Sequence, residues 1–119
     1  MAQTFEKNKL SGSTNGRGIK ITATATPGTL IHTAVSGTTN WDEIFLFVAN
    51  TDTVERKLTI EYGGTTSPDD LIEVPIPPES GLVAVLPGLI VNNGVAVRAF
   101  AASANVLIGF GYIHEVRTV

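Results

Sequence analysis

The sequence contains no cysteine, which excludes disulfide bonds, thiolate zinc sites and cysteine nucleophiles together. Only two histidines occur in 119 residues, and neither belongs to a His-x-His or HExxH pattern, so the spacing offers no ready metal site. Charged residues make up 16% of the chain, below the roughly 25% of a typical soluble domain. So low a charge content suggests that partners cover part of the surface.

Clusters of basic residues and long apolar runs are also missing. Eight Lys and Arg residues are scattered along a chain of formal net charge −3, whereas nucleic-acid binding needs a clustered cationic face. No apolar stretch reaches the roughly 20 residues of a membrane span, and the first residues lack the apolar centre of a signal peptide. We therefore expect no nucleic-acid partner, no membrane association, and synthesis in the cytoplasm.

What the sequence does contain is alternation with a period of two. Residues 18–26, GIKITATAT, alternate apolar and polar side chains as in a half-exposed strand. Residues 41–50, WDEIFLFVAN, form a nearly continuous apolar run, which is typical of a central strand covered on both faces, either by a second sheet or by a partner. Residues 71–78, LIEVPIPP, end in prolines that donate no ladder hydrogen bonds, which favours a sheet edge.

The remaining segments predict further strands with defined faces. Asn93-Gly94 is a strong tight-turn signal, so the strands before and after it are expected to form a hairpin. The last strand is expected to place Ile108, Phe110, Tyr112 and His114 on one face. Alternation in residues 54–62 predicts Leu58, Ile60 and Tyr62 inward and Lys57, Thr59 and Glu61 outward.

Together these patterns predict an all-β chain. About eight strands, regular turns and no helical period favour a single β-sandwich of about eight antiparallel strands, either jelly-roll or immunoglobulin-like. The sandwich is expected to span residues 18–119. Residues 1–17 are polar and aperiodic, so we expect an extended N-terminal arm with two apolar anchors, Phe5 and Leu10, a frayed terminus being the alternative.

Groups able to carry catalysis are few. We interpret His32 and His114 as packed or interface residues, because no carboxylates converge on either by spacing. The adjacent acidic pairs at residues 42–43 and 69–70 are not automatic catalytic dyads, since neighbours along a strand point to opposite faces. No serine lies in a G-x-S-x-G context. We expect no enzyme activity, no cofactor and no metal, with calcium at the residue 69–70 loop left open.

The second half of the chain carries a pattern of turn glycines and apolar alternation. A strand ending in Tyr62-Gly63-Gly64 leads to ESGLVAVLPGLIVNNGVAVRAFA at residues 79–101, and the chain closes on GFGYIHEV at residues 109–116. Over residues 58–116 this pattern resembles small virion proteins of tailed bacteriophages, in particular head decoration or cement proteins. The resemblance implies a β-sandwich, often a homotrimer, made in the host cytoplasm. It would bind the capsid exterior, clamp neighbouring major capsid proteins and stabilise the capsid.

On this interpretation the working surfaces are the arm and two loops. We expect capsid and subunit contacts at Phe5, Leu10, Asp52, Thr53, Pro68 and Asp69. The alternative is a tail, fibre or baseplate module that binds a host glycan through Trp41, Asp42 and Glu43, where an aromatic ring is followed by two carboxylates. The sequence leaves open the virion location, the oligomeric state and the host.

Overall fold

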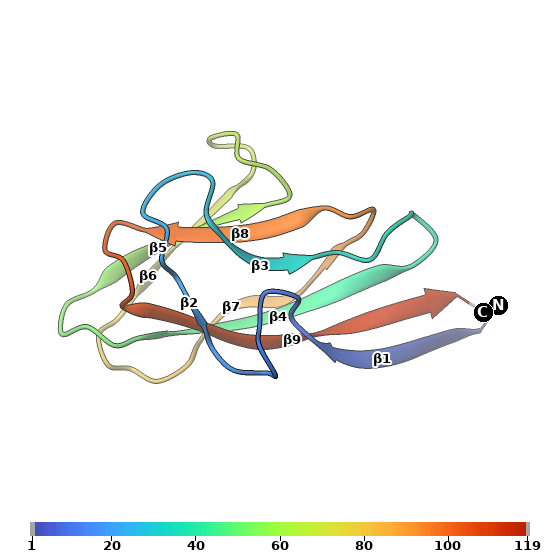
Figure 1. Cartoon of the computed structure of the whole chain (residues 1–119), viewed down its shortest axis with the longest axis horizontal. Coiled ribbons are helices and arrows are strands. Elements are labelled where there is room, and N and C mark those ends of the chain that lie inside the picture. The colour runs from blue at the N-terminus through green and yellow to red at the C-terminus, as the bar shows by residue number, and fades with distance from the viewer. Residues whose placement is uncertain (1, 119) are drawn as a thin grey trace.

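Alternating side chains in this sequence form β-strands that bury one face, and the computed structural model describes residues 2–118 as strands and loops. Two antiparallel sheets pack face to face (Figure 1). Sheet A contains β1 (Gln3–Lys9), β2 (Ile19–Lys20), β4 (Trp41–Asn50), β7 (Val83–Val91) and β9 (Leu107–Thr118). Sheet B contains β3 (Thr29–Thr33), β5 (Arg56–Tyr62), β6 (Leu71–Ile76) and β8 (Ala96–Ala101). The expected all-β sandwich is confirmed.

From β2 onward the chain crosses between the two sheets at every connection except β5 to β6, which are neighbours in sheet B. Sheet A runs β1-β9-β4-β7, with the short β2 also paired to β9, and sheet B runs β3-β8-β5-β6. The edge position expected for residues 71–78 is confirmed by β6, and β4 is central as expected, between β9 and β7. No helix in the described residues is long and apolar enough to cross a membrane.

The space between the sheets is filled by aliphatic side chains. On β4 the inward positions Ile44, Leu46 and Val48 are fully buried, and Leu58 and Ile60 of β5 face them from sheet B. Every buried hydrophobic residue of the described chain is Leu, Ile, Val or Ala. The aromatic residues must therefore lie elsewhere.

The structure corrects three local predictions. The turn at Asn93-Gly94 forms, with φ values of 58° and 70°, but it carries the chain from sheet A to sheet B, so the expected hairpin is wrong. The strand expected over residues 18–26 is limited to Ile19–Lys20. The run at residues 41–50 buries only one face within residues 2–118, because no described element covers the outer side of sheet A, and cover of that side by a partner stays a prediction.

The alternation predicted for β5 holds, but two of its outward residues are covered and not exposed. Thr59 and Glu61, expected outward, are buried at 3% and 1% exposure. The Glu61 carboxylate accepts hydrogen bonds from the Thr26 hydroxyl at 2.5 Å and the Gly28 amide at 2.6 Å. A loop thus covers this part of β5 and supplies the donors that a buried carboxylate needs.

Much of the segment expected to be an arm belongs to sheet A. Residues 3–9 form β1, which pairs along β9 from Gln3 opposite Thr118 to Lys9 opposite Tyr112. Both ends of the described chain therefore lie together at one end of a molecule 49 Å long (Figure 1).

Candidate functional site

Aromatic side chains gather on the outer side of sheet A. Directly opposite residues of an antiparallel pair share a face, so the register of β4 with β9 places Phe45 beside Tyr112 and Phe47 beside Phe110. Val116 of β9 has Trp41 of β4 opposite it on one side and Phe5 of β1 opposite it on the other. We call this surface the aromatic face. Its aromatic members are Phe5, Trp41, Phe45, Phe47, Phe110 and Tyr112.

The placement is unusual because aromatic rings are large apolar groups that ordinarily dominate cores. The chain has one Trp, two Tyr and five Phe, eight in all, and six of these lie on the aromatic face. Phe5 is 63% exposed, and Ile90 of the neighbouring β7 is 58% exposed. The other five aromatic residues of the face are half-buried, so the face is a partly exposed apolar surface between two exposed edges. Apolar surface that stays exposed in this way marks an interaction site.

The rings are held in place by one another. Phe45 stacks on Tyr112 with centroids 4.9 Å apart and an interplanar angle of 19°, and His114 meets the Phe45 ring edge-on at 5.1 Å. The Lys7 ammonium lies 4.4 Å from the centre of the Tyr112 ring, a cation–π contact. His114 Nδ1 also lies 3.8 Å from a Glu43 carboxylate oxygen. The surface is ordered before any partner arrives.

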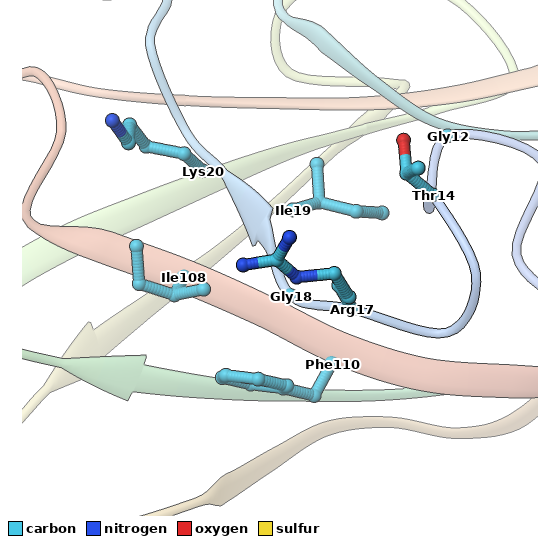
Figure 2. Close-up of a pocket in the computed structure, with 8 residues that line it drawn as sticks. All are labelled: Gly12, Thr14, Arg17, Gly18, Ile19, Lys20, Ile108 and Phe110. Carbon is cyan, nitrogen blue, oxygen red and sulfur yellow. The ribbon is translucent and has the colours of Figure 1, made fainter.

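A second feature adjoins the aromatic face where β1 ends and β2 begins. Both strands pair with β9, and the turn that joins them stands away from β9. An open depression lies between this turn and Phe110 (Figure 2). The depression is lined by Gly12, Thr14, Arg17, Gly18, Ile19, Lys20, Ile108 and Phe110. It therefore combines two cations with an apolar floor.

Histidine and carboxylate do meet once in the interior, in an arrangement that the sequence spacing did not reveal. His32 Nε2 lies 2.7 Å from Asp42 Oδ2, and the Ser11 amide donates to His32 Nδ1 at 2.9 Å. Because Nδ1 accepts a hydrogen bond there, Nε2 carries the ring hydrogen and donates to Asp42. The Val35 amide donates to the same Asp42 oxygen at 3.0 Å.

This buried cluster links β3, β4 and the turn after β1, and its role is structural. His32 belongs to β3 in sheet B and Asp42 to β4 in sheet A, with exposures of 5% and 2%. In a serine nucleophile the hydroxyl would contact the imidazole, whereas here the Ser11 hydroxyl accepts from the Thr33 amide at 2.6 Å. The cluster fixes the turn that follows Leu10, which is itself buried at 1% exposure.

The residues predicted for capsid contact are spread over the molecule. Phe5 is on the aromatic face, but Leu10 belongs to the core of its own chain. Asp52 and Thr53 lie in the β4–β5 loop, and Pro68-Asp69 in the exposed β5–β6 loop, and Figure 1 shows these loops in separate places. The structure does not bring the predicted contact residues together.

Asp52 and Asp70, one in each of these loops, accept hydrogen bonds from residues near them in the chain. Asp52 accepts from Arg56 at 2.6 and 2.9 Å and from the Thr53 amide at 2.7 Å, and the Arg56 hydrogen bonds chiefly lower the pKa of Asp52. Asp70 accepts from the Thr66 amide at 3.0 Å. Within residues 2–118, no three His, Asp or Glu side chains gather as metal ligands would.

The three residues predicted for glycan contact are consecutive in β4, so they point to opposite faces of sheet A. Trp41 and Glu43 lie on the aromatic face, but Asp42 points between the sheets. The site that geometry indicates is thus broader than the predicted one. It extends over β4 and β9, and its chemistry is that of binding through ring faces, with Lys7, Glu43 and His114 as polar neighbours. Comparison with known proteins finds no match for this chain among family models, curated proteins or solved structures.

Proposed function

We propose that this chain is a structural virion protein, a head decoration protein of a tailed bacteriophage that binds the outer capsid surface and clamps neighbouring major capsid proteins. The observation that carries the proposal is the aromatic face, a rigid apolar surface that no other described element of the chain covers. The pattern in residues 58–116 supplies the virion context.

The strand order supports this proposal. With the two-residue β2 set aside, eight strands form two four-stranded sheets, β1-β9-β4-β7 and β3-β8-β5-β6, in the order of a jelly roll. Jelly rolls recur in viral capsid and lectin domains. Fold alone does not decide function, so the argument depends on the surface.

The size of the aromatic face suits a protein partner. Four strands of 7 to 12 residues, about 4.8 Å apart, give a face of roughly 600 Å². A standard protein interface covers about 800 Å² of each partner. Since the sheet is already ordered, little conformational entropy is lost on binding. On a capsid the same contact repeats over the lattice, so modest contacts gain avidity.

Removing exposed apolar side chains from the face tests the proposal. The variant Phe5→Ser with Ile90→Ser changes two exposed residues and should leave the core intact. Loss of about 3 kcal/mol of apolar contact would weaken each site roughly 100-fold. Co-sedimentation with empty expanded heads, assembled from the major capsid protein of the same phage, measures this directly.

A matched control separates the face from the loops. Val54 is 47% exposed in the β4–β5 loop, next to Thr53, so Val54→Ser removes one exposed apolar side chain away from the face. Full binding by Val54→Ser and weak binding by the face variant supports the proposal. Weak binding by Val54→Ser and full binding by the face variant would show that the β4–β5 loop, and not the aromatic face, contacts the capsid. Failure of the wild-type chain to bind heads would end the capsid proposal.

A second candidate, glycan binding by a tail, fibre or baseplate module, has one observation in its favour. Trp41, Tyr112 and Glu43 share the aromatic face, so ring faces for stacking lie near a hydrogen-bonding carboxylate. A glycan array with the purified chain distinguishes the candidates. Sugar-specific signal that Trp41→Ala abolishes would favour the glycan module, whereas a decoration protein gives none.

A further inference from the structure

The depression in Figure 2 contains two cations that make no ion pair with any residue in 2–118. Arg17 and Lys20 both line it, and neither takes part in a salt bridge there, whereas Arg56, Lys57 and Arg117 each pair with a carboxylate. Unpaired cations beside an apolar floor are available to an anionic ligand.

The charge of the sequence around the depression is opposite to that of the rest of the chain. Residues 1–20 contain four Lys or Arg and one Glu, a net charge of +3. Since the whole chain carries −3, residues 21–119 carry −6. The positive potential is therefore local to β1, β2 and the turn between them, and it directs an acidic group to this end of the aromatic face.

The turn that carries Arg17 is held by hydrogen bonds and close packing. The Ser13 hydroxyl donates to the Arg17 carbonyl at 2.7 Å, and the Arg17 amide donates to the Thr14 carbonyl at 3.0 Å. A Cβ added to Gly18 would lie 2.5 Å from Ile108 Cγ2 and 2.7 Å from Phe110 Cε2, so the backbone rests directly on the floor. The backbone that carries Arg17 is thus fixed before a ligand binds.

We propose that this depression binds a carboxylate of an acidic peptide segment, with Arg17 and Lys20 facing the carboxylate and Ile108 and Phe110 contacting an apolar side chain next to it. The inference rests on the proposed function, because the segment would belong to the protein that covers the aromatic face. A guanidinium fork matches a carboxylate bidentately.

A peptide fits the surroundings better than the other anionic polymers. Nucleic acid needs many phosphate contacts, and two cations in a chain of net charge −3 supply few. The floor is apolar and continues into the aromatic face through Phe110, which suits a segment that alternates acidic and apolar side chains. An isolated phosphate would leave this floor unused.

The probe is an acetylated, amidated tetrapeptide, Glu-Phe-Glu-Phe, titrated into the 15N-labelled chain and followed by NMR. The amides of Gly18, Lys20 and Phe110 should shift, and Arg17→Gln and Lys20→Gln should each weaken binding about fivefold, as for a partly exposed ion pair. The matched control is Lys57→Gln, which also removes one positive charge but from the Lys57–Glu73 pair on sheet B. It should bind as the wild type does.

Competing ligands decide the chemical class. The tetrapeptide with Gln in place of Glu should not bind. If inorganic phosphate or a hyaluronan oligosaccharide produces the same shifts at equal or lower concentration, the peptide assignment is overturned. Shifts that spread over the surface, or that Arg17→Gln and Lys20→Gln leave unchanged, also overturn it.

The two proposals fail separately. If the tetrapeptide binds at Arg17 and Lys20 but wild-type protein does not bind heads, the site stands and the capsid function fails. If the Phe5 and Ile90 variant loses head binding while a double variant, Arg17→Gln with Lys20→Gln, binds heads fully, the function stands and the depression has no part in it.

Discussion

The buried contact between His32 and Asp42 makes a prediction that two substitutions of one residue can test. Asp42 Oδ2 accepts from His32 Nε2 and from the Val35 amide, while Asp42 Oδ1 is buried without a partner. Asp42→Asn can keep its oxygen at the Oδ2 position, so the donors from His32 and Val35 stay satisfied, but its amide then lies without a partner where Oδ1 is buried. Asp42→Ala removes the acceptor from both.

The magnitudes follow from the hydrogen bonds. In Asp42→Ala two buried or partly buried donors lose their acceptor, at about 1–3 kcal/mol each, so the free energy of unfolding should fall by about 3–5 kcal/mol. Asp42→Asn buries one unpaired amide group in place of Oδ1 and should cost about 1–3 kcal/mol, less than Asp42→Ala. The inference depends on His32 being neutral, with its hydrogen on Nε2 because the Ser11 amide donates to Nδ1.

Urea unfolding followed by far-UV circular dichroism at neutral pH measures both variants. If Asp42→Asn is as destabilised as Asp42→Ala, the carboxylate charge is essential, and the neutral histidine inferred from the hydrogen bonds is wrong. If neither variant is destabilised, the cluster contributes nothing to the fold. His32→Gln is a further control, since it leaves the Asp42–Val35 hydrogen bond in place.

Three further predictions concern other buried contacts. Glu61→Ala leaves the Gly28 amide without its acceptor, and the free energy of unfolding in urea should fall by about 2–4 kcal/mol; an unchanged midpoint would contradict the role of the loop. Burial raises the pKa of Tyr62 from 10.0 to about 12, so its stabilising effect is complete below pH 10.0 and lost as the pH rises through about 12. Allowing for its partial exposure this amounts to about 1 kcal/mol, measured as the difference in alkaline stability from Tyr62→Phe; equal pH dependence of the two proteins would refute it. Gly111→Ala would force a Cβ against the Phe45 carbonyl and should lower the melting temperature by several degrees, at a cost of about 1–3 kcal/mol; an unaltered melting temperature would show that β9 moves freely.

The sequence pattern predicted those features that depend only on residues close together in the chain. Period-two alternation and turn residues gave the β-sandwich, the faces of the last strand and the turn at Asn93-Gly94. That turn forms as expected, yet its sequence says nothing about which sheet each flanking strand joins. Pairing of β1 with β9 joins residues more than 100 positions apart, such as Phe5 and Val116. The polar residues of β1 show no alternation from which this pairing could be predicted.

The aromatic face was hidden for a related reason. Residues 44–49 are apolar at every position, so alternation does not tell which side faces the core. The structure puts branched aliphatic Ile44 and Leu46 inward and Phe45 and Phe47 outward. The contact between His32 and Asp42 links strands of different sheets, and spacing along the chain does not reveal such a meeting.

The separation of an aliphatic interior from an aromatic exterior has an optical consequence. Trp41, the single tryptophan of the chain, lies on the aromatic face, so intrinsic emission and much of the near-ultraviolet dichroism originate at the outside of sheet A. Quenching or a wavelength shift on mixing would then report a docked ligand without any attached dye. The same signal would be a poor monitor of interior packing.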